Sequence, residues 1–145
     1  MNEDCRMRVR KMTIKDHSQV LSLWRNSEGI GTGDGDSKKD INSYLKRNPG
    51  LSFVAVADKK IIGAVLCGHD GRRGYLHHLA VAPAHRGMHL GTSLVKACLS
   101  GLQALGIPKC NIFVYKTNTN GLEFWKKAGW NTRIDLLVMQ KKPGS

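Results

Sequence analysis

A short glycine-containing loop, residues 85–91, separates an apolar run from a long amphipathic segment, and this junction constrains the fold more than any other part of the chain. The run at residues 75–82 predicts a strand. Beyond the loop, apolar residues recur at helical spacing over residues 90–105, and the glycine and proline at 106–108 supply a stop. The start of a helix carries unpaired N–H groups and a partial positive charge. The junction therefore predicts an anion-binding loop.

The loop by itself leaves a second interpretation open. Two isolated glycines, Gly87 and Gly91, more often serve a turn or close packing than a phosphate site. Other nucleotide-binding motifs are absent from the sequence. The sequence contains no G-x-x-x-x-G-K-[ST], and the glycines of residues 29–35 follow a predicted helix instead of a strand and miss the third glycine position of G-x-G-x-x-G.

The rest of the chain alternates between apolar runs and amphipathic segments, which predicts one α/β domain over residues 1–145. Strands are expected at residues 8–11, 51–57, 61–68, 75–82 and 111–115, with a final strand or strand pair at 130–140. Helices are expected at residues 15–26, 37–47, 90–105 and 121–128. Ser37 and Asp40 have the spacing of a capping box at the start of the second helix. Residues 58–60 predict a hairpin turn, and residues 68–74 predict a polar, glycine-rich loop.

The composition fits one domain without a membrane span. The chain has 145 residues, 41% of them hydrophobic, which is enough to bury a core and carry a cleft. Its longest apolar runs are far shorter than the ~20 residues of a transmembrane helix. The N-terminus shows no secretory signal, so we expect a cytoplasmic protein. The cysteines Cys5, Cys67, Cys98 and Cys110 show no C-x-x-C spacing and predict neither a disulfide framework nor a metal site.

The charge favours an anionic ligand. Lys and Arg outnumber Asp and Glu by 23 to 11, which gives a formal net charge of +12. A nucleotide cofactor with a pyrophosphate needs only a few of these charges. A nucleic-acid-binding module is the alternative from another class, but the basic residues are scattered and no known reading motif accompanies them. We therefore expect no nucleic-acid partner.

Several stretches in register resemble a known family. They are Leu-Ala-Val-Ala-Pro at 79–83, Arg-Gly-Met-His-Leu-Gly at 86–91, Asn-Thr-Asn-Gly at 118–121 and Phe-Trp-Lys-Lys-Ala-Gly-Trp at 124–130. In order and spacing they resemble the successive signatures of the GNAT N-acetyltransferase superfamily. Within it, Gly-His-Asp-Gly-Arg-Arg-Gly-Tyr at 68–75, followed by His-His-Leu-Ala-Val at 77–81, resembles a small bacterial subgroup whose acceptors are mostly unassigned.

The resemblance implies a GNAT-like fold: a central, mostly antiparallel sheet with a splayed strand pair, flanked by about four helices. It also implies acetyl-CoA as cosubstrate, with its pyrophosphate on the N–H groups of the loop and its thioester carbonyl polarised by an N–H of the preceding strand. The implied cofactor-binding residues are Leu79, Ala80, Val81, Arg86, Gly87, Met88, His89, Leu90, Gly91, Thr92, Asn118, Gly121 and Trp125. His89 stands where the family usually has glycine, so its backbone must avoid positive φ or accept a modest strain.

The chemistry calls for a base. An acceptor ammonium must lose a proton before its nitrogen can attack a thioester. His77 and His78 are the candidates, because adjacent strand residues point to opposite faces and one should face the cleft; a packing role is the alternative for either. Tyr75 shares the face of His77 and would order a water. Trp125 occupies the position where many relatives have a tyrosine that protonates the thiolate. Tyr115 is the substitute candidate; the alternative is a thiolate that takes its proton from water or leaves unprotonated.

The acceptor is expected to enter over the polar segments 29–37 and 69–74, where Asp36 and Asp70 would attract or orient an amine. Turn formation or helix capping is the alternative role for such residues. We therefore expect N-acetyl transfer from acetyl-CoA to a primary amine of a small molecule or a peptide, without a metal. A non-catalytic acyl-CoA-binding protein is the alternative, because the usual tyrosine is missing. A homodimer is compatible with this architecture, and no membrane partner is expected.

Overall fold

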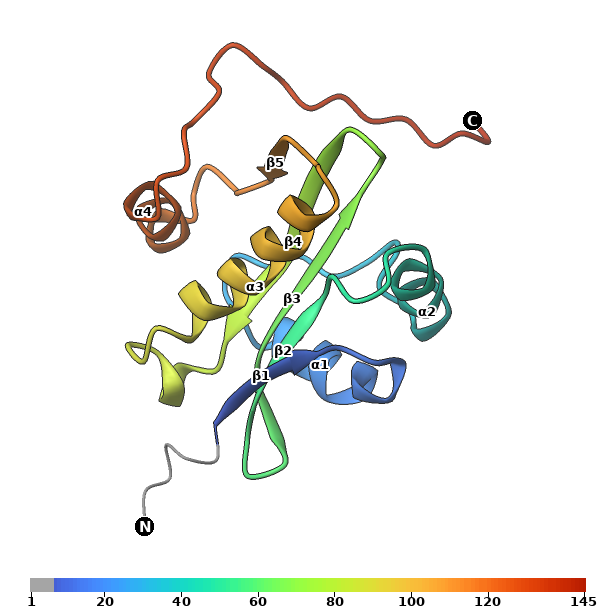
Figure 1. The fold of residues 1–145 in the computed structure, drawn as a ribbon. Coiled ribbons are helices and arrows are strands. Elements are labelled where there is room, and N and C mark those ends of the chain that lie inside the picture. The colour runs from blue at the N-terminus through green and yellow to red at the C-terminus, as the bar shows by residue number, and fades with distance from the viewer. Residues whose placement is uncertain (1–6) are drawn as a thin grey trace.

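Helices cover both faces of one mixed sheet in the computed structural model, which describes residues 7–145 (Figure 1). In spatial order the strands are β1 (Arg8–Lys11), β2 (Phe53–Ala57), β3 (Lys60–His69), β4 (Arg73–Val81) and β5 (Lys109–Ile112). Neighbouring strands are antiparallel except β4 and β5, which are parallel. The α-helices of the described residues are α1 (His17–Arg25), α2 (Lys38–Arg47), α3 (Leu90–Ala104) and α4 (Thr119–Lys127). The predicted α/β class with a mostly antiparallel sheet is confirmed.

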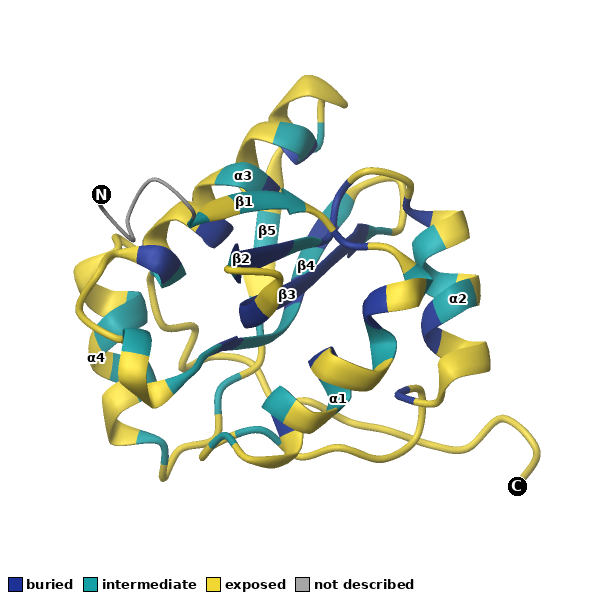
Figure 2. Ribbon diagram, turned by 90° about the horizontal axis from the view of Figure 1, so that it is seen from below, coloured by how far each residue is buried: buried dark blue, intermediate teal, exposed yellow. Residues whose placement is uncertain are grey.

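Two apolar clusters, one on each face of the sheet, form the core. On the α3 face, Leu94 and Cys98 are fully buried against residues of β2, β3 and β4. On the other face, Trp24 of α1 and Ile41 of α2 pack over the alternate residues of the same strands. Figure 2 shows the buried residues concentrated in the central strands. Because β3 is covered on both faces, its sequence is an unbroken apolar run and not an alternating one.

Local signals set the element boundaries as the sequence predicts. The Ser37 hydroxyl accepts a hydrogen bond of 3.1 Å from the backbone N–H of Asp40 and caps α2. Asp58 and Lys59 join β2 to β3 with φ values of 49° and 69°, the left-handed conformations that a two-residue type I′ hairpin turn requires. At the other end of the sheet, β5 ends at Ile112 instead of continuing through residue 115.

The segment 68–74 differs from its prediction as an open loop. Strand β3 continues to His69 and β4 begins at Arg73, so only the tip between them is a turn. Two of its glycines lie within strands at points of close packing. A Cβ on Gly74 would lie 2.5 Å from a methyl carbon of Leu102, and one on Gly68 would meet the Tyr44 hydroxyl at 2.5 Å. These glycines let α3 and α2 approach the two faces of the sheet.

The C-terminal tail, residues 131–140, also differs from its prediction as a strand or strand pair. It follows α4 without regular structure and shows exposed residues throughout (Figure 2). The reason is a missing partner: the tail forms no ladder with β5, which remains an edge strand of the described sheet. Elsewhere, none of the helices described over residues 7–145 is long and apolar enough to cross a membrane.

Candidate active site

Strands β4 and β5 part after four residue pairs, and the gap between their backbones beyond that point is called the slot. The two strands pair from Arg73 with Lys109 to Leu76 with Ile112; β4 then continues to Val81 paired with β3 alone. The N–H of Ala82 points to β3, because it donates to the Ile62 carbonyl at 2.7 Å. Since successive strand residues alternate, the N–H groups of Leu79 and Val81 point the other way, into the slot. This splay matches the expected strand pair and leaves two backbone donors without a neighbouring strand.

A β-bulge in β4 shapes the wall of this slot. Leu66 of β3 pairs with His77 and Ala64 pairs with Ala80, so β4 has one residue more than β3 between these two pairs. The extra residue falls at His78, whose φ is 55°. The bulge cancels the strict alternation, and both histidines lie on the face of the sheet that α1 covers. The expectation that the two would point to opposite faces was wrong for this reason.

His78 is held by the loop that leads into α2. Its Nε2 lies 3.2 Å from both carboxylate oxygens of Asp36, and its ring meets the Trp24 ring edge-on with centroids 4.9 Å apart. Asp36 is only 8% exposed, and Gly33 donates its N–H to the same carboxylate at 3.0 Å. His17 Nε2 lies 2.9 Å from the Asp36 carbonyl oxygen. The Asp36 carboxylate therefore serves His78 and its own turn, not an open surface.

His77 stands at the apex of the slot. Its ring stacks on Tyr75, with centroids 6.2 Å apart, and lies 5.9 Å from the ring of Phe113, the first residue beyond β5. Burial lowers the pKa of His77 and the neighbouring His78 lowers it further, while Asp36 opposes the shift. A lowered pKa leaves this imidazole neutral at neutral pH, with a lone pair available to accept a proton.

The start of α3 forms the predicted anion cradle. No side chain caps this fifteen-residue helix, so its first N–H groups are open. The loop reaches it through two left-handed residues, Gly87 with φ 82° and His89 with φ 61°. His89 thus adopts a left-handed conformation that favours glycine and accepts the strain of a side chain there. Arg86 is exposed beside the cradle, and its Nε donates to the Val81 carbonyl at 3.1 Å, which ties the loop to the end of β4.

Packing against α4 is the second role of this loop. A Cβ on Gly91 would lie 3.3 Å from the Phe124 ring. Gly91 therefore permits close packing against α4 in addition to its place in the cradle. Trp125 packs edge-on against Phe124 and Trp130, each pair with centroids 5.1 Å apart. Its indole has no acidic proton to give, and these contacts assign it to packing. The Asn118 side chain caps α4 by accepting the Gly121 N–H at 3.0 Å.

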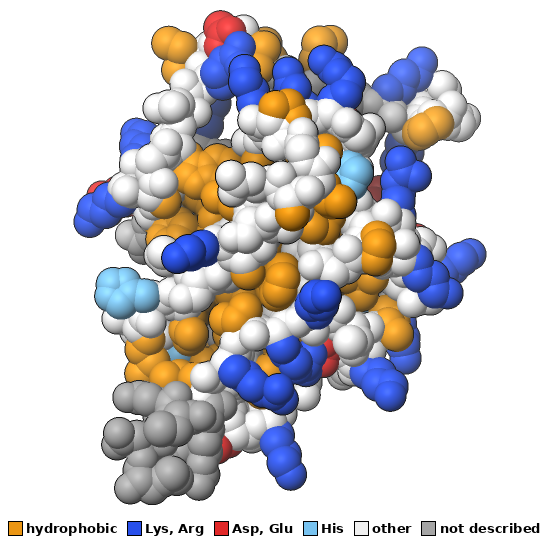
Figure 3. Space-filling model, viewed as in Figure 1, with side chains coloured by type: hydrophobic (Ala, Val, Ile, Leu, Met, Phe, Trp, Pro, Cys, Tyr) orange, Lys and Arg blue, Asp and Glu red, His pale blue; other side chains and the backbone are white. Residues whose placement is uncertain are grey.

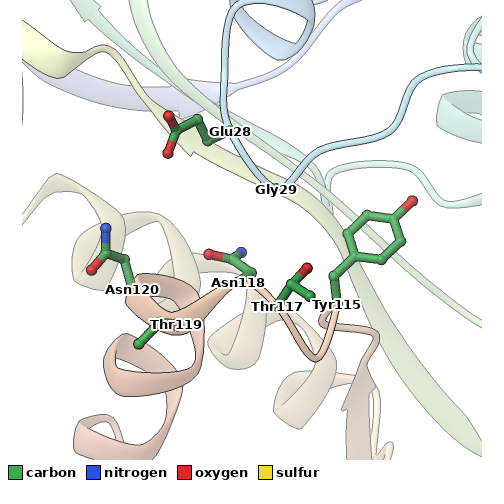
Figure 4. A pocket seen from close by; sticks show the side chains of 7 residues that line it. All are labelled: Glu28, Gly29, Tyr115, Thr117, Asn118, Thr119 and Asn120. Carbon is green, nitrogen blue, oxygen red and sulfur yellow. The ribbon is translucent and has the colours of Figure 1, made fainter.

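A polar pocket of about 230 Å³ lies where the loop after α1 meets the start of α4. Figure 4 shows the loop at Gly29 descending toward Asn118, with Tyr115 beside it. A Cβ on Gly31 would lie 2.7 Å from the Tyr115 hydroxyl, so this glycine lets the ring approach the loop backbone. The lining residues are Glu28, Gly29, Tyr115, Thr117, Asn118, Thr119 and Asn120. The loop spans the slot from Asn118 on one side to β4 on the other.

Not every candidate joins this group. Asp70 lies at the tip of the β3–β4 hairpin, before β4 begins, whereas His78 lies five residues into that strand. Its carboxylate accepts the N–H groups of Arg72 and Arg73 at 2.8 Å, and the Arg73 and Arg72 bonds lower the pKa of Asp70. The structure thus assigns it to a turn. Phe113 and Glu28, conversely, were not among the candidates; no motif marked them, because both owe their place to the tertiary fold.

Metal ligands are not gathered at the slot. Within residues 7–145, no group of three His, Cys, Asp or Glu side chains could hold a metal ion. Cys67 and Cys98 are buried free thiols, and Cys110 is half-buried and free; Cys5 lies outside the described residues. Figure 3 shows Lys and Arg scattered over the face that carries α3, with few acidic groups among them. That face suits an anion without forming one dense basic patch.

Known proteins resemble this chain in sequence and in fold. The Acetyltransferase (GNAT) family matches residues 18–130. An acetyltransferase of Yersinia pestis (strain Pestoides F) is 30% identical over 136 residues, which cover 94% of this chain and 95% of that protein. The fold is similar to that of PaiA N-acetyltransferase from Thermoplasma acidophilum in complex with coenzyme A, with a TM-score of 0.78, 22% identity and coverage of 88% of this chain and 91% of that one. An aminoglycoside acetyltransferase from an uncultured soil metagenomic sample, in complex with sisomicin, gives a TM-score of 0.73 at 15% identity and covers 97% of this chain and 99% of its own.

Proposed function

The chain belongs to the GNAT family of acetyltransferases, and we propose that it transfers the acetyl group of acetyl-CoA directly to the nitrogen of a primary amine. The proposal rests on two features near the end of β4: the uncapped start of α3 and the parting of β4 from β5. One feature suits a pyrophosphate and the other suits an extended arm with a thioester. PaiA, which was solved with coenzyme A, has the same fold.

The cofactor fits the groups present along β4 and α3. The N–H groups of residues 88–92 would hold the pyrophosphate, with Arg86 beside them. The backbone of Leu79 to Val81 would pair with the pantetheine arm. One of the two N–H groups that point into the slot would donate to the thioester oxygen, where negative charge develops as the amine attacks. Loss of such a donor typically costs ~10²–10³ in rate.

His77 is the proposed base. The amine nitrogen forms a bond to the thioester carbon while its proton passes to the neutral His77 imidazole, directly or through a water ordered by Tyr75. Collapse of the tetrahedral intermediate then breaks the C–S bond and releases the thiolate of coenzyme A. Tyr115, on the opposite side of the slot, is the proposed proton donor to that thiolate. The lowered pKa of His77 supports its role, because a base must be unprotonated at the working pH.

His78 and Asp36 are proposed as positioning residues. Their contact fixes the bulge that aims the slot-facing N–H groups, and it also fixes the loop at 29–36 that the acceptor must pass. Asp36→Asn removes the charge but keeps the shape, and should lower kcat more than it raises KM for the amine. Asp34→Asn, an exposed change two residues away, is the matched control. Equal kinetics for the two variants would remove Asp36 from the machinery.

Cofactor binding is the first test. Calorimetric titration with acetyl-CoA should give one-to-one binding, with free ADP and NAD as controls. Arg86→Ala should weaken binding by about tenfold, the typical loss for a charge-assisted hydrogen bond to phosphate. Arg72→Ala removes an equal charge at the hairpin tip and should leave the affinity unchanged. Binding of none of the ligands would refute the proposal.

The second test is the pH profile on a panel of small amines and peptide amines. The rate at low substrate should fall on acidification as His77 becomes protonated, and this fall should come below the ordinary imidazole range, because burial lowers the pKa of His77. His77→Gln should depress kcat and abolish this acid limb, whereas His69→Gln, at the hairpin tip, should change neither. An unaltered acid limb in His77→Gln would assign the base elsewhere. One-to-one binding of acetyl-CoA without turnover on any amine would favour a non-catalytic acyl-CoA-binding protein.

A further inference from the structure

Two positive charges beside the proposed base have no carboxylate to balance them. Arg73 of β4 and Lys109 of β5 are direct partners in the parallel ladder. Within residues 7–145, no Asp or Glu lies within ion-pair distance of either side chain. We propose that this pair binds an acidic side chain of a peptide acceptor whose N-terminal amine lies at His77. The inference rests on the proposed transfer to an amine and adds the class of acceptor.

The pairing of Arg73 with Lys109 is unfavourable for the fold alone. Like charges directly opposite each other on neighbouring strands are destabilising. The Arg73 guanidinium donates a hydrogen bond of 3.2 Å to the carbonyl of Arg72, which leaves its charge uncompensated. The carboxylate closest in sequence, that of Asp70, accepts backbone N–H groups of the turn instead. A local conflict of this kind is typical of a site where a ligand brings the opposite charge.

Both charges lie on the face of the sheet that carries His77. Side chains alternate along a strand, and partners in a parallel ladder point to the same face. Two rows of side chains therefore run side by side on this face: Arg73, Tyr75 and His77 on β4, and Lys109, Asn111 and Phe113 on and just beyond β5. The ring centroids of Phe113 lie 6.1 Å from Tyr75 and 5.9 Å from His77, which agrees with a shared face.

This strip of two rows is open to solvent. Lys109, Asn111 and Phe113 are exposed, and the row on β4 is half-buried. Figure 1 shows β5 at the edge of the sheet, on the side of β4 away from α2. An extended chain that lies along the strip would therefore meet the cationic pair at one end and the base at the other.

The length of the strip sets the distance between the two ends of the acceptor. His77 lies four residues beyond Arg73 on β4. At ~3.3 Å per residue this separation is roughly 13 Å. A free amino acid is too short, because its carboxylate lies next to its amine. An extended peptide covers the distance in about four residues. The acceptor that fits therefore has its acidic residue near the fifth position.

The protonation state of the amine also favours a peptide N-terminus. At pH 7 about a tenth of α-amino groups are unprotonated, against roughly one in 2,500 lysine side chains. Burial lowers the pKa of His77, and a weaker base removes a proton more readily from the less basic amine. The base and the cationic pair thus suit the same acceptor.

Peptide kinetics give the first test. The probes are the C-terminal amides of Ala-Ala-Ala-Ala-Glu and of its Gln counterpart, with Ala-Glu-Ala-Ala-Ala amide as the position control. kcat/KM for the first peptide should exceed that for the Gln peptide by about fivefold, through KM, as for one partly exposed ion pair. The position control should behave like the Gln peptide. Equal values for all three would overturn the inference and leave the transfer itself in place.

Removal of the two charges should abolish the preference. Arg73→Gln with Lys109→Gln should accept the Glu and Gln peptides equally. The matched control, Lys59→Asn with Lys60→Gln, removes two charges at the opposite end of β3 and should keep the preference. The urea midpoint of the first variant should not fall, because repulsion between like charges is relieved. A preference that survives, or a lower midpoint, would assign Arg73 and Lys109 to another role.

Binding without chemistry separates this inference from the proposed reaction. The protein loaded with coenzyme A is titrated calorimetrically with the Glu peptide at low salt. Binding that weakens about fivefold without Arg73 and Lys109, with no acetylation of the peptide, would support the subsite and contradict the transfer. Acetylation that does not depend on the two residues would do the reverse. No binding of the Glu peptide at millimolar concentration would overturn the inference.

Discussion

The chain divides into two regions that differ in burial. Every buried side chain of the described chain lies within residues 7–105; from residue 106 onward no described side chain is buried. The slot lies across this division, since β4 and the start of α3 belong to the first region and β5 and α4 to the second. One wall of the site is therefore part of the core. The other is held by the short β4–β5 ladder and by partly buried apolar side chains that pack against the edge of the core.

The largest difference between the regions should appear on truncation of equivalent leucines. Leu94, in the first region, is 0% exposed and packs against Gly63 of β3, whereas Leu136, in the second region, is 58% exposed. Leu94→Ala should lower the free energy of unfolding by about 3 kcal/mol. Leu136→Ala should lower it by less than about 1 kcal/mol. Urea unfolding of both variants measures these losses. Similar losses would show that side chains of the two regions contribute equally to the free energy of unfolding.

Two ion pairs, each with two hydrogen bonds of the same lengths, offer a second comparison. Arg10 binds Asp16 through two hydrogen bonds of 2.9 and 2.8 Å, as Arg133 binds Asp135 in the tail, but only Asp16 is buried. Asp16→Asn should cost about 2 kcal/mol, because it leaves a guanidinium and a buried amide poorly matched. Asp135→Asn should leave the unfolding midpoint unchanged.

The Asp16 contribution should also depend on pH. Burial alone would raise the pKa of Asp16, but the hydrogen bonds from Arg10 and Thr13 outweigh it and the pKa is lowered. The folded state thus binds fewer protons than the unfolded state, so the stabilisation is present at neutral pH and is lost as the pH falls through the lowered pKa. The wild-type protein should lose stability on acidification more steeply than Asp16→Asn. Parallel curves would contradict this assignment.

Amide hydrogen exchange, measured with and without acetyl-CoA, tests more directly whether the second region is the less stable one. Amides of α4 and of residues 113–118 should exchange quickly in the free protein, because few buried contacts hold them. Saturation with acetyl-CoA should slow them by at least about tenfold. Amides at the hairpin tip, residues 70–72, lie away from the slot and serve as the internal control. Unchanged exchange in α4 would mean that the cofactor does not engage this wall.

The smallest predicted effect concerns the cradle itself. His89 has a left-handed backbone at φ 61°, where glycine is less strained. His89→Gly should stabilise the protein by about 0.5 kcal/mol, because relief of strain is partly offset by the greater freedom of the unfolded chain. Acetyl-CoA affinity should stay the same, since the backbone donors do not move. A loss of affinity would show that the His89 side chain contacts the cofactor.

Most of the architecture could be predicted from sequence because its signals are local. The capping pair at the start of α2, the turn between β2 and β3, and the apolar spacing of α3 each act within a few residues. The bulge could not be predicted, because it depends on how β4 aligns with β3. His78 and its neighbour have no sequence feature that marks an extra residue in the strand. For the same reason the contact between His78 and Asp36, 42 residues apart, was not foreseen.

The sequence by itself determined the family, the order of elements and the loop that would hold a pyrophosphate, since these depend on residue type at short spacing. Only the tertiary structure decided that both histidines share a face, that Asp36 joins the site while Asp70 caps a turn, and that the tail lacks a partner. These outcomes depend on strand register and on which edges remain open. Both are set by contacts between distant segments, whose free energy is not encoded in any single stretch of chain.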